Sequence, residues 1–143
     1  MRLKRYLEMR GADGGPWRRL PSLTAYWVGL LYDDEALDDA WELVKEWNAE
    51  ERQKLRDEVP QRGFKAVIRN TTVHALAQET LALSRRGLEK RARLDRNGRD
   101  ETRYLRPLEE IVTRGVTPAE ELLEKYFNEW NESVAPLYDQ YAY

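Results

Sequence analysis

The chain has 143 residues, 41% of them hydrophobic and 35% charged, with a formal net charge of -2 at pH 7. This composition predicts a soluble chain of one-domain size, and it provides no electrostatic basis for binding nucleic acid or an anionic membrane. There is no cysteine, which excludes disulfides and thiolate metal sites, and no apolar run could span a bilayer, so we expect a cytoplasmic protein without membrane or targeting segments.

The first predicted element is a β-strand over about residues 2–10. Side chains alternate between the two faces of a strand, so Glu8 and Arg10 share one face while Leu7 and Met9 occupy the other. If the apolar pair packs on the protein, Glu8 is placed to bind a hard cation such as Mg²⁺. Arg10 is placed to hold a phosphate through two parallel hydrogen bonds. The alternative is a surface ion pair with no further role.

A Gly-rich turn ends this strand by residue 16, and residues 20–143 predict a mainly α scaffold of about six helices. Capping residues, prolines and glycines mark the helix boundaries, at Pro21, Asp33, Asn48, Pro60, Asn70 or Thr71, Arg93, Tyr104, Gly115 and Thr117. Apolar side chains recur three and four residues apart along these helices, so we expect them to be buried. Among them are Leu37, Trp41, Leu123, Phe127 and Trp130, and we also place Trp17 in the core.

Three other groups of residues have two interpretations each. The basic segment 85–99 is either a solvated helix face or a site for RNA, and no aromatic residues interleave its charges to favour RNA. Asp33 and its acidic neighbours lack the order and the glycine of a calcium loop, which favours a helix start. His74, the only histidine, has no second histidine or cysteine to share a metal and is expected at the surface or its boundary.

The sequence resembles glutamate–cysteine ligase of the plant and proteobacterial type. The resemblance rests on YLEMRGADGGPWRRLP at residues 6–21 and YWVGLLYD at residues 26–33. It continues through GVTPAEELLE at 115–124 and SVAPLY at 133–138, so it extends over essentially the whole chain as a single region.

The resemblance implies a ligase related to glutamine synthetase, in which the γ-carboxylate of glutamate is phosphorylated from ATP and the cysteine amine then displaces phosphate. Glu8 and Arg10 match a Glu-x-Arg of that family's active-site sheet. The resemblance therefore implies that Glu8 is a Mg²⁺ ligand and that Arg10 is a catalytic residue binding the phosphate of ATP. Asp13, Arg18 and Arg19 lie near this motif, either facing the same cleft or as turn and surface charges.

The resemblance covers only the C-terminal portion of such a ligase. The other metal carboxylates and most of the nucleotide and glutamate contacts would lie in the missing N-terminal portion, so we expect the isolated chain to be inactive. The chain would then need that portion as its partner. The alternative is a non-catalytic helical module that packs on a partner chain or self-associates, because a lone strand has an edge and an apolar face that need cover.

Overall fold

The computed structural model describes residues 2–3, 7–8, 11–12 and 15–141, with side chains from residue 11 onward. The predicted mainly helical fold is confirmed, and the described residues form seven α-helices. These are α1 (Leu20–Leu31), α2 (Asp34–Val44), α3 (Ala49–Arg62), α4 (Val73–Arg91), α5 (Arg106–Arg114), α6 (Pro118–Asn128) and α7 (Ala135–Gln140). Within these ranges, no helix combines the length and the apolar character needed to cross a membrane.

The N-terminal segment contains two short strands in place of one continuous strand. β1 (Arg2–Leu3) and β2 (Leu7–Glu8) pair with each other in antiparallel register, with Arg2 opposite Glu8 and Leu3 opposite Leu7. The expectation of a single strand over residues 2–10 is therefore wrong in its extent. The pairing has a physical reason, because backbone N–H and C=O groups need partners and a hairpin supplies them within the segment.

A second hairpin was not predicted. β3 (Val67–Ile68) and β4 (Thr71–Thr72) are antiparallel, with Ile68 opposite Thr71. Thr71 is thus part of a strand, and α4 begins after Thr72, whose hydroxyl accepts a hydrogen bond of 3.1 Å from the amide of Ala75. The longest helix starts later than expected because Thr72, and not Asn70 or Thr71, is its N-cap.

Local capping signals were otherwise reliable. Asn48 and Glu51 form the predicted reciprocal capping box at the start of α3, and Thr117 and Glu120 form another at the start of α6. Pro60 does not end α3, which continues to Arg62. A proline this close to the C-terminus removes only one hydrogen bond of the last turns, so the helix can run past it.

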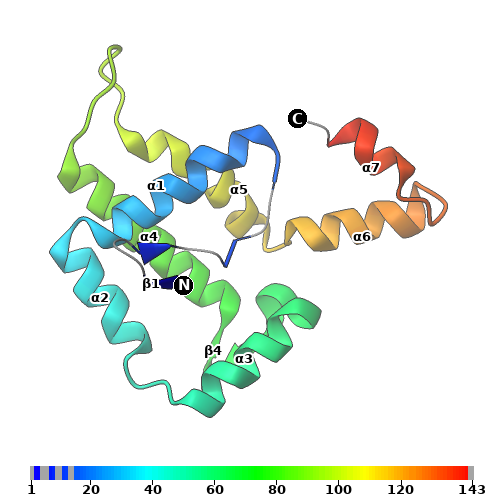
Figure 1. Cartoon of the computed structure of the whole chain (residues 1–143), viewed down its shortest axis with the longest axis horizontal. Helices are drawn as coiled ribbons and strands as arrows, with labels where there is room; N and C mark the ends of the chain where they lie inside the picture. The colour runs from blue at the N-terminus through cyan, green and yellow to red at the C-terminus, as the bar shows by residue number, and fades with distance from the viewer. Residues whose placement is uncertain (1, 4–6, 9–10, 13–14, 142–143) are drawn as a thin grey trace.

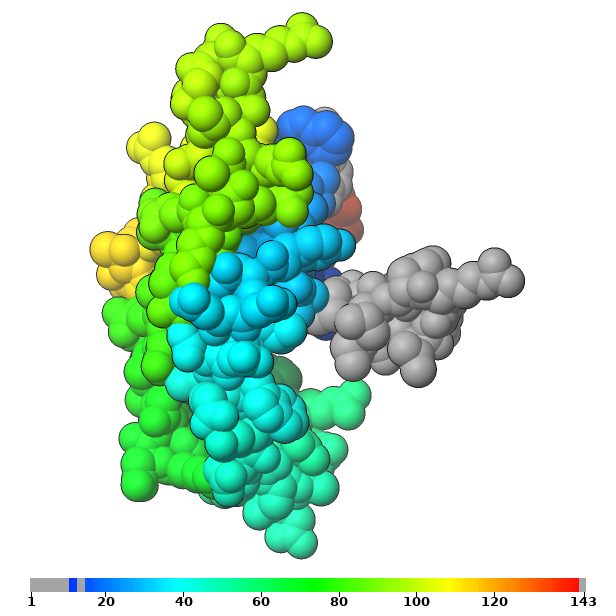
Figure 2. All heavy atoms as spheres, turned by 90° about the vertical axis from the view of Figure 1, so that its left-hand side faces the viewer, coloured from blue at the N-terminus to red at the C-terminus, as the bar shows by residue number. Residues whose placement is uncertain are grey.

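The core forms where α1 crosses α4, with α2, α5 and the 3₁₀ helix η3 (Glu101–Leu105) packed around the crossing (Figure 1). Ala25 of α1, Leu81 and Leu88 of α4 and Leu105 of η3 make one buried cluster. Figure 2 shows α2 and α4 side by side on one face of the molecule, with α3 at one end of it and the loop after α4 at the other. The central helix α4 therefore organises the packing of this region.

Several apolar side chains predicted to be buried are exposed instead. The exposed fraction is 59% for Trp41 on α2, 61% for Phe127 on α6 and 75% for Trp17, and Leu37 and Leu123 are exposed as well. Trp130 is buried, as expected. The periodicity correctly placed apolar residues on one stripe of each helix, but no described element covers the outer parts of the stripes on α2 and α6. These surfaces are candidates for contact with another polypeptide.

Candidate functional site

The predicted catalytic pair lies at the edge of what the structure describes. The backbone of Glu8 belongs to β2 and pairs with Arg2. The side chain of Glu8 and all of Arg10 lie outside the described residues, as does Asp13. The roles of Glu8 in binding Mg²⁺ and of Arg10 in binding phosphate therefore stay predictions.

The carboxylate and histidine side chains that could bind a metal are described from residue 11 onward, apart from Asp13. Within this described part, no three carboxylate or histidine side chains come close enough to hold a metal ion. Asp33, considered above as part of a calcium cluster, instead caps α2 by accepting a hydrogen bond of 2.9 Å from the amide of Ala36. The magnesium prediction consequently depends on Glu8.

A charged hollow of about 470 Å³ lies on the surface between the N-terminal end of α1 and α5. Arg18, from the 3₁₀ helix η1 (Trp17–Arg19), reaches it from one side. Its remaining lining comes from α5, namely Arg106, Glu109, Glu110, Thr113 and Arg114. Sequence reasoning left Arg18 open as either a cleft residue or a surface charge, and it missed the α5 residues because they lie about 90 positions away along the chain.

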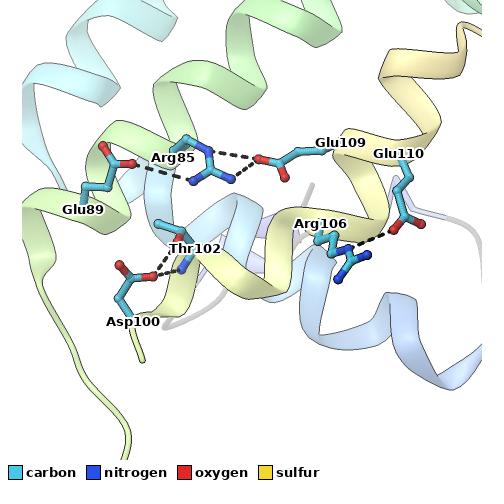
Figure 3. A network of polar contacts seen from close by, with 7 residues as sticks. All are labelled: Arg85, Glu89, Asp100, Thr102, Arg106, Glu109 and Glu110. Atoms are coloured by element: carbon cyan, nitrogen blue, oxygen red, sulfur yellow. Dashed lines mark hydrogen bonds and ion pairs between the residues drawn. The ribbon is translucent and has the colours of Figure 1, made fainter. Parts of the chain in front are cut away.

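The arginines of this hollow already have carboxylate or carbonyl partners. Arg18 lies 3.3 Å from Glu110 and Arg106 donates to the same carboxylate at 3.1 Å. Arg114 forms an ion pair with Glu121 and donates a hydrogen bond of 3.2 Å to the carbonyl oxygen of Glu110. Figure 3 shows the Arg106 contact with Glu110 on α5. The hollow is thus a mixed-charge surface and not a cluster of unpaired cations ready for an anion.

A second ion pair joins α4 to α5 beside this hollow. The Nε of Arg85 donates to Glu109 at 2.9 Å, a second guanidinium nitrogen donates to the same oxygen, and Glu89 lies on the other side of Arg85 (Figure 3). The hydrogen bond to Glu109 raises the pKa of Arg85 above its ordinary value. The two sets of ion pairs therefore connect η1, α4 and α5.

The basic segment 85–99 is largely neutralised within the chain. Arg86 pairs with Asp39, Lys90 with Glu35, Arg91 with Glu101 and Arg99 with Asp95. Such pairing favours a solvated structural face over an RNA site, because nucleic-acid binding depends on cations free to replace counterions.

His74 is half-buried between α4 and α5. Its Nε2 lies 2.6 Å from the carbonyl oxygen of Val112, and its ring packs at 5.1 Å from that of Phe64, measured between centroids. Because a carbonyl can only accept, Nε2 must carry a hydrogen. The histidine is therefore at the boundary of the core, as predicted, where it joins two helices.

Comparison with known proteins places this arrangement in context. Residues 1–140 match the family model described as glutamate-cysteine ligase family 2 (GCS2). The chain is 48% identical to chloroplastic glutamate–cysteine ligase of Nicotiana tabacum and 49% identical to glutamate–cysteine ligase A of Oryza sativa subsp. indica, in both cases over all 143 residues. A relative from Medicago truncatula is 46% identical over the same length. The matched region includes both Glu8 and Arg10.

The chain spans only 26% of the tobacco relative and 28% of the rice relative. These relatives are plant enzymes. Of the plant and proteobacterial type that we expected, the comparisons therefore show the plant relationship. Their names also overturn the cytoplasmic expectation: they are called chloroplastic, which points to a plastid and not to the cytoplasm. Absence of cysteine was compatible with a cytoplasmic setting but could not distinguish it from another reducing compartment.

Proposed function

Because the chain belongs to glutamate-cysteine ligase family 2, we propose that it forms the C-terminal part of a plant-type glutamate–cysteine ligase and contributes one edge of its active site. The observation that carries this proposal is the identity of 46–49% to plant ligases over the whole chain. The matched region includes the N-terminal Glu-x-Arg as well as the helical scaffold. The activity itself, joining the γ-carboxylate of glutamate to the amine of cysteine, belongs to the complete enzyme.

In this proposal Glu8 and Arg10 act from the N-terminal segment. The carboxylate of Glu8 would hold Mg²⁺, since hard cations prefer oxygen ligands. The guanidinium of Arg10 would bind the phosphate being transferred, with two donors in a fixed geometry. ATP with Mg²⁺, when bound, supplies the phosphoryl group that activates glutamate. A positive side chain next to that group stabilises the charge that spreads over its oxygens in the transition state.

The short β1–β2 hairpin fits a role at the edge of a larger sheet. A two-stranded hairpin is only marginally stable by itself, and its outer edges have unpaired backbone groups. Strands contributed by the rest of the ligase could pair with these edges. Further along the chain, the ion pair of Arg18 with Glu110 joins η1 to α5.

A second candidate function is supported by a different observation. The exposed apolar stripes of α2 and α6, which include Trp41 and Phe127, are also what a non-catalytic module would use to bind a partner chain. The two candidates differ in one measurable property. Only the ligase proposal requires Arg10 for turnover.

The experiment compares the isolated chain with a chimera in which it replaces the matching region of the tobacco enzyme. Phosphate release from ATP is measured with Mg²⁺, glutamate and cysteine. We expect no activity from the isolated chain and cysteine-dependent activity from the chimera. In the chimera, Arg10→Lys should lower kcat by about 10²-fold or more, as loss of one transition-state contact does, with an unchanged melting temperature.

Arg96→Lys, the same substitution in the loop after α4, is the matched control and should leave kcat within about twofold of the parent. Glu8→Gln should raise the Mg²⁺ concentration needed for half-maximal rate. A folded but inactive chimera, assayed where the tobacco parent is active, would refute the ligase proposal. An active chimera with kcat insensitive to Arg10→Lys would remove Arg10 from the site.

A further inference from the structure

The last two helices form an arm that extends away from the helical body (Figure 1). We define the arm as residues 118–140, which comprise α6, α7 and the turn between them. Among the described residues, no other helix or strand packs extensively along α6 or α7. The arm is therefore an element whose sides are open to another polypeptide.

Among the side chains that the structure describes, the ion pairs between the arm and the body lie at the base of the arm. Glu120 accepts hydrogen bonds of 2.8 Å from both the amide and the hydroxyl of Thr117, and it lies 3.6 Å from Lys65 at the end of the 3₁₀ helix η2 (Gly63–Lys65). Glu121 forms the ion pair with Arg114 of α5. These contacts set the direction in which α6 leaves the body, and none of them covers its apolar side.

The far end of the arm is ordered by its own side chains. Lys125 lies 5.9 Å from the ring centroids of both Trp130 and Tyr141, so the cation connects α6 to the segment after α7. Trp130 is buried, and its ring meets that of Tyr141 edge-on at 6.4 Å. This is a folded end with a defined shape, as a docking element requires.

Large apolar side chains line the outside of this folded arm. The exposed fraction is 54% for Leu123, 61% for Phe127, 58% for Val134 and 73% for Tyr138. Leu123 and Phe127 are four residues apart and so lie on one helix face. Leaving this much apolar area in water is unfavourable by roughly 25 cal/mol per Å², so the face is stabilised when it is covered.

The rest of the arm surface is acidic. Residues 118–140 contain six carboxylate side chains and one lysine. Glu120 and Glu121 are used at the base, whereas the other four have no ion-pair partner among the side chains that the structure describes. These four are Glu124, Glu129, Glu132 and Asp139. A complementary surface would therefore be apolar with a rim of lysine or arginine.

We propose that the arm docks through Leu123 and Phe127 onto the part of the ligase that this chain does not contain, at an apolar surface rimmed by cations. This inference rests on the proposed function. The chain covers 26–28% of its relatives, so most of a complete ligase remains to provide that surface. A second copy of the chain fits less well, because a twofold contact between two arms would bring their acidic surfaces together.

The test is amide hydrogen exchange over residues 119–128, measured in the isolated chain and in the tobacco chimera. Docking should slow exchange of these amides by about tenfold or more in the chimera. Leu123→Ser with Phe127→Ser should return exchange toward the rate of the isolated chain. The matched control, Asn128→Ser with Gln140→Ser, places two serines at exposed, uncharged positions of α6 and α7 outside the apolar pair and the four carboxylates, and it should retain the protection.

Both variants are also made in the isolated chain, where the circular dichroism of either should match the parent because all four side chains are exposed there. Equal exchange in the isolated chain and the chimera would overturn the arm proposal. So would protection in the isolated chain that increases with its concentration, since a second copy would then be the occupant. The activity of the chimera is a separate readout: an active chimera with an unprotected arm refutes only the docking, and an inactive chimera with a protected arm refutes only the ligase function.

Discussion

Gly29 of α1 and Gly87 of α4 lie against each other so closely that a Cβ atom on Gly87 would overlap the carbonyl oxygen of Gly29. A Cβ on Gly29 would likewise overlap the backbone of Ser84. At this crossing the hydroxyl of Ser84, which is fully buried, donates a hydrogen bond of 2.9 Å to the carbonyl oxygen of Tyr26. The two glycines therefore allow α1 and α4 to pack closely at this crossing.

Gly87→Ala should therefore destabilise the chain. The added methyl group meets backbone, which cannot rotate away, so α1 and α4 must separate and loosen the cluster around Leu88. We expect a loss of about 2–3 kcal/mol in the free energy of unfolding, although alanine favours a helix by about 1 kcal/mol. Urea denaturation measures this change. Gly11→Ala is the control, because a Cβ there meets nothing within 4 Å; equal stability of the two variants would contradict the close packing.

Replacing His74 tests the connection between α4 and α5. His74→Phe keeps a ring beside Phe64 but removes the donor to Val112, and it should cost about 1 kcal/mol of unfolding free energy, the usual net value of one hydrogen bond. His74→Ala removes the ring as well and should cost more. The two variants are compared by thermal and urea unfolding. A His74→Phe variant as stable as the parent would show that the 2.6 Å contact does not contribute.

The Arg85–Glu109 pair should show a small, salt-sensitive coupling. Both side chains are partly exposed, so we expect about 0.5–1 kcal/mol from a double-mutant cycle with alanine at low ionic strength. The coupling should fall when salt is raised to about 0.5 M, because screening acts on exposed charges. The Lys54–Glu58 pair on α3, with a longer separation of 3.7 Å and a lysine that is 70% exposed, is the comparison and should couple less. A coupling unchanged by salt would contradict this electrostatic account.

The turn after α4 should lose stability in acid through Asp95. The amide of Arg99 and the guanidinium of Arg103 donate to this carboxylate and hold its pKa well below the ordinary value. Protonation is thus easier in the unfolded state. The stabilisation is complete above the unfolded pKa of about 3.9 and is lost as pH falls from there toward the lower folded pKa.

Asp95→Asn should therefore be less stable than the parent near pH 6, and the difference should shrink below about pH 4. Melting temperatures of both proteins between pH 6 and pH 2.5 measure this. Asp139→Asn is the control, because Asp139 makes no ion pair among the described side chains. A difference between parent and Asp95→Asn that stays constant over this range would refute the role of the Asp95 charge.

Local chemistry determined much of the fold. The capping boxes at Asn48 and Thr117 were identified from sequence because each depends on residues only three positions apart. The two short hairpins were harder to predict. Each has strands of two residues, which carry too little alternation to be distinguished from a loop or, in β1–β2, from one longer strand.

The sequence by itself determined the helical class, the family and the candidate pair Glu8 and Arg10, because these depend on neighbouring residues and on a long, specific motif. Only the tertiary structure showed that Arg18 contacts Glu110 and that Gly29 packs against Gly87. The residues of each pair are far apart in the sequence, so their contact cannot be inferred from it. The tertiary structure also decided which apolar stripes are covered. Periodicity places Leu123 and Phe127 on one face of α6, but their burial requires a second surface, and no described part of this chain supplies one.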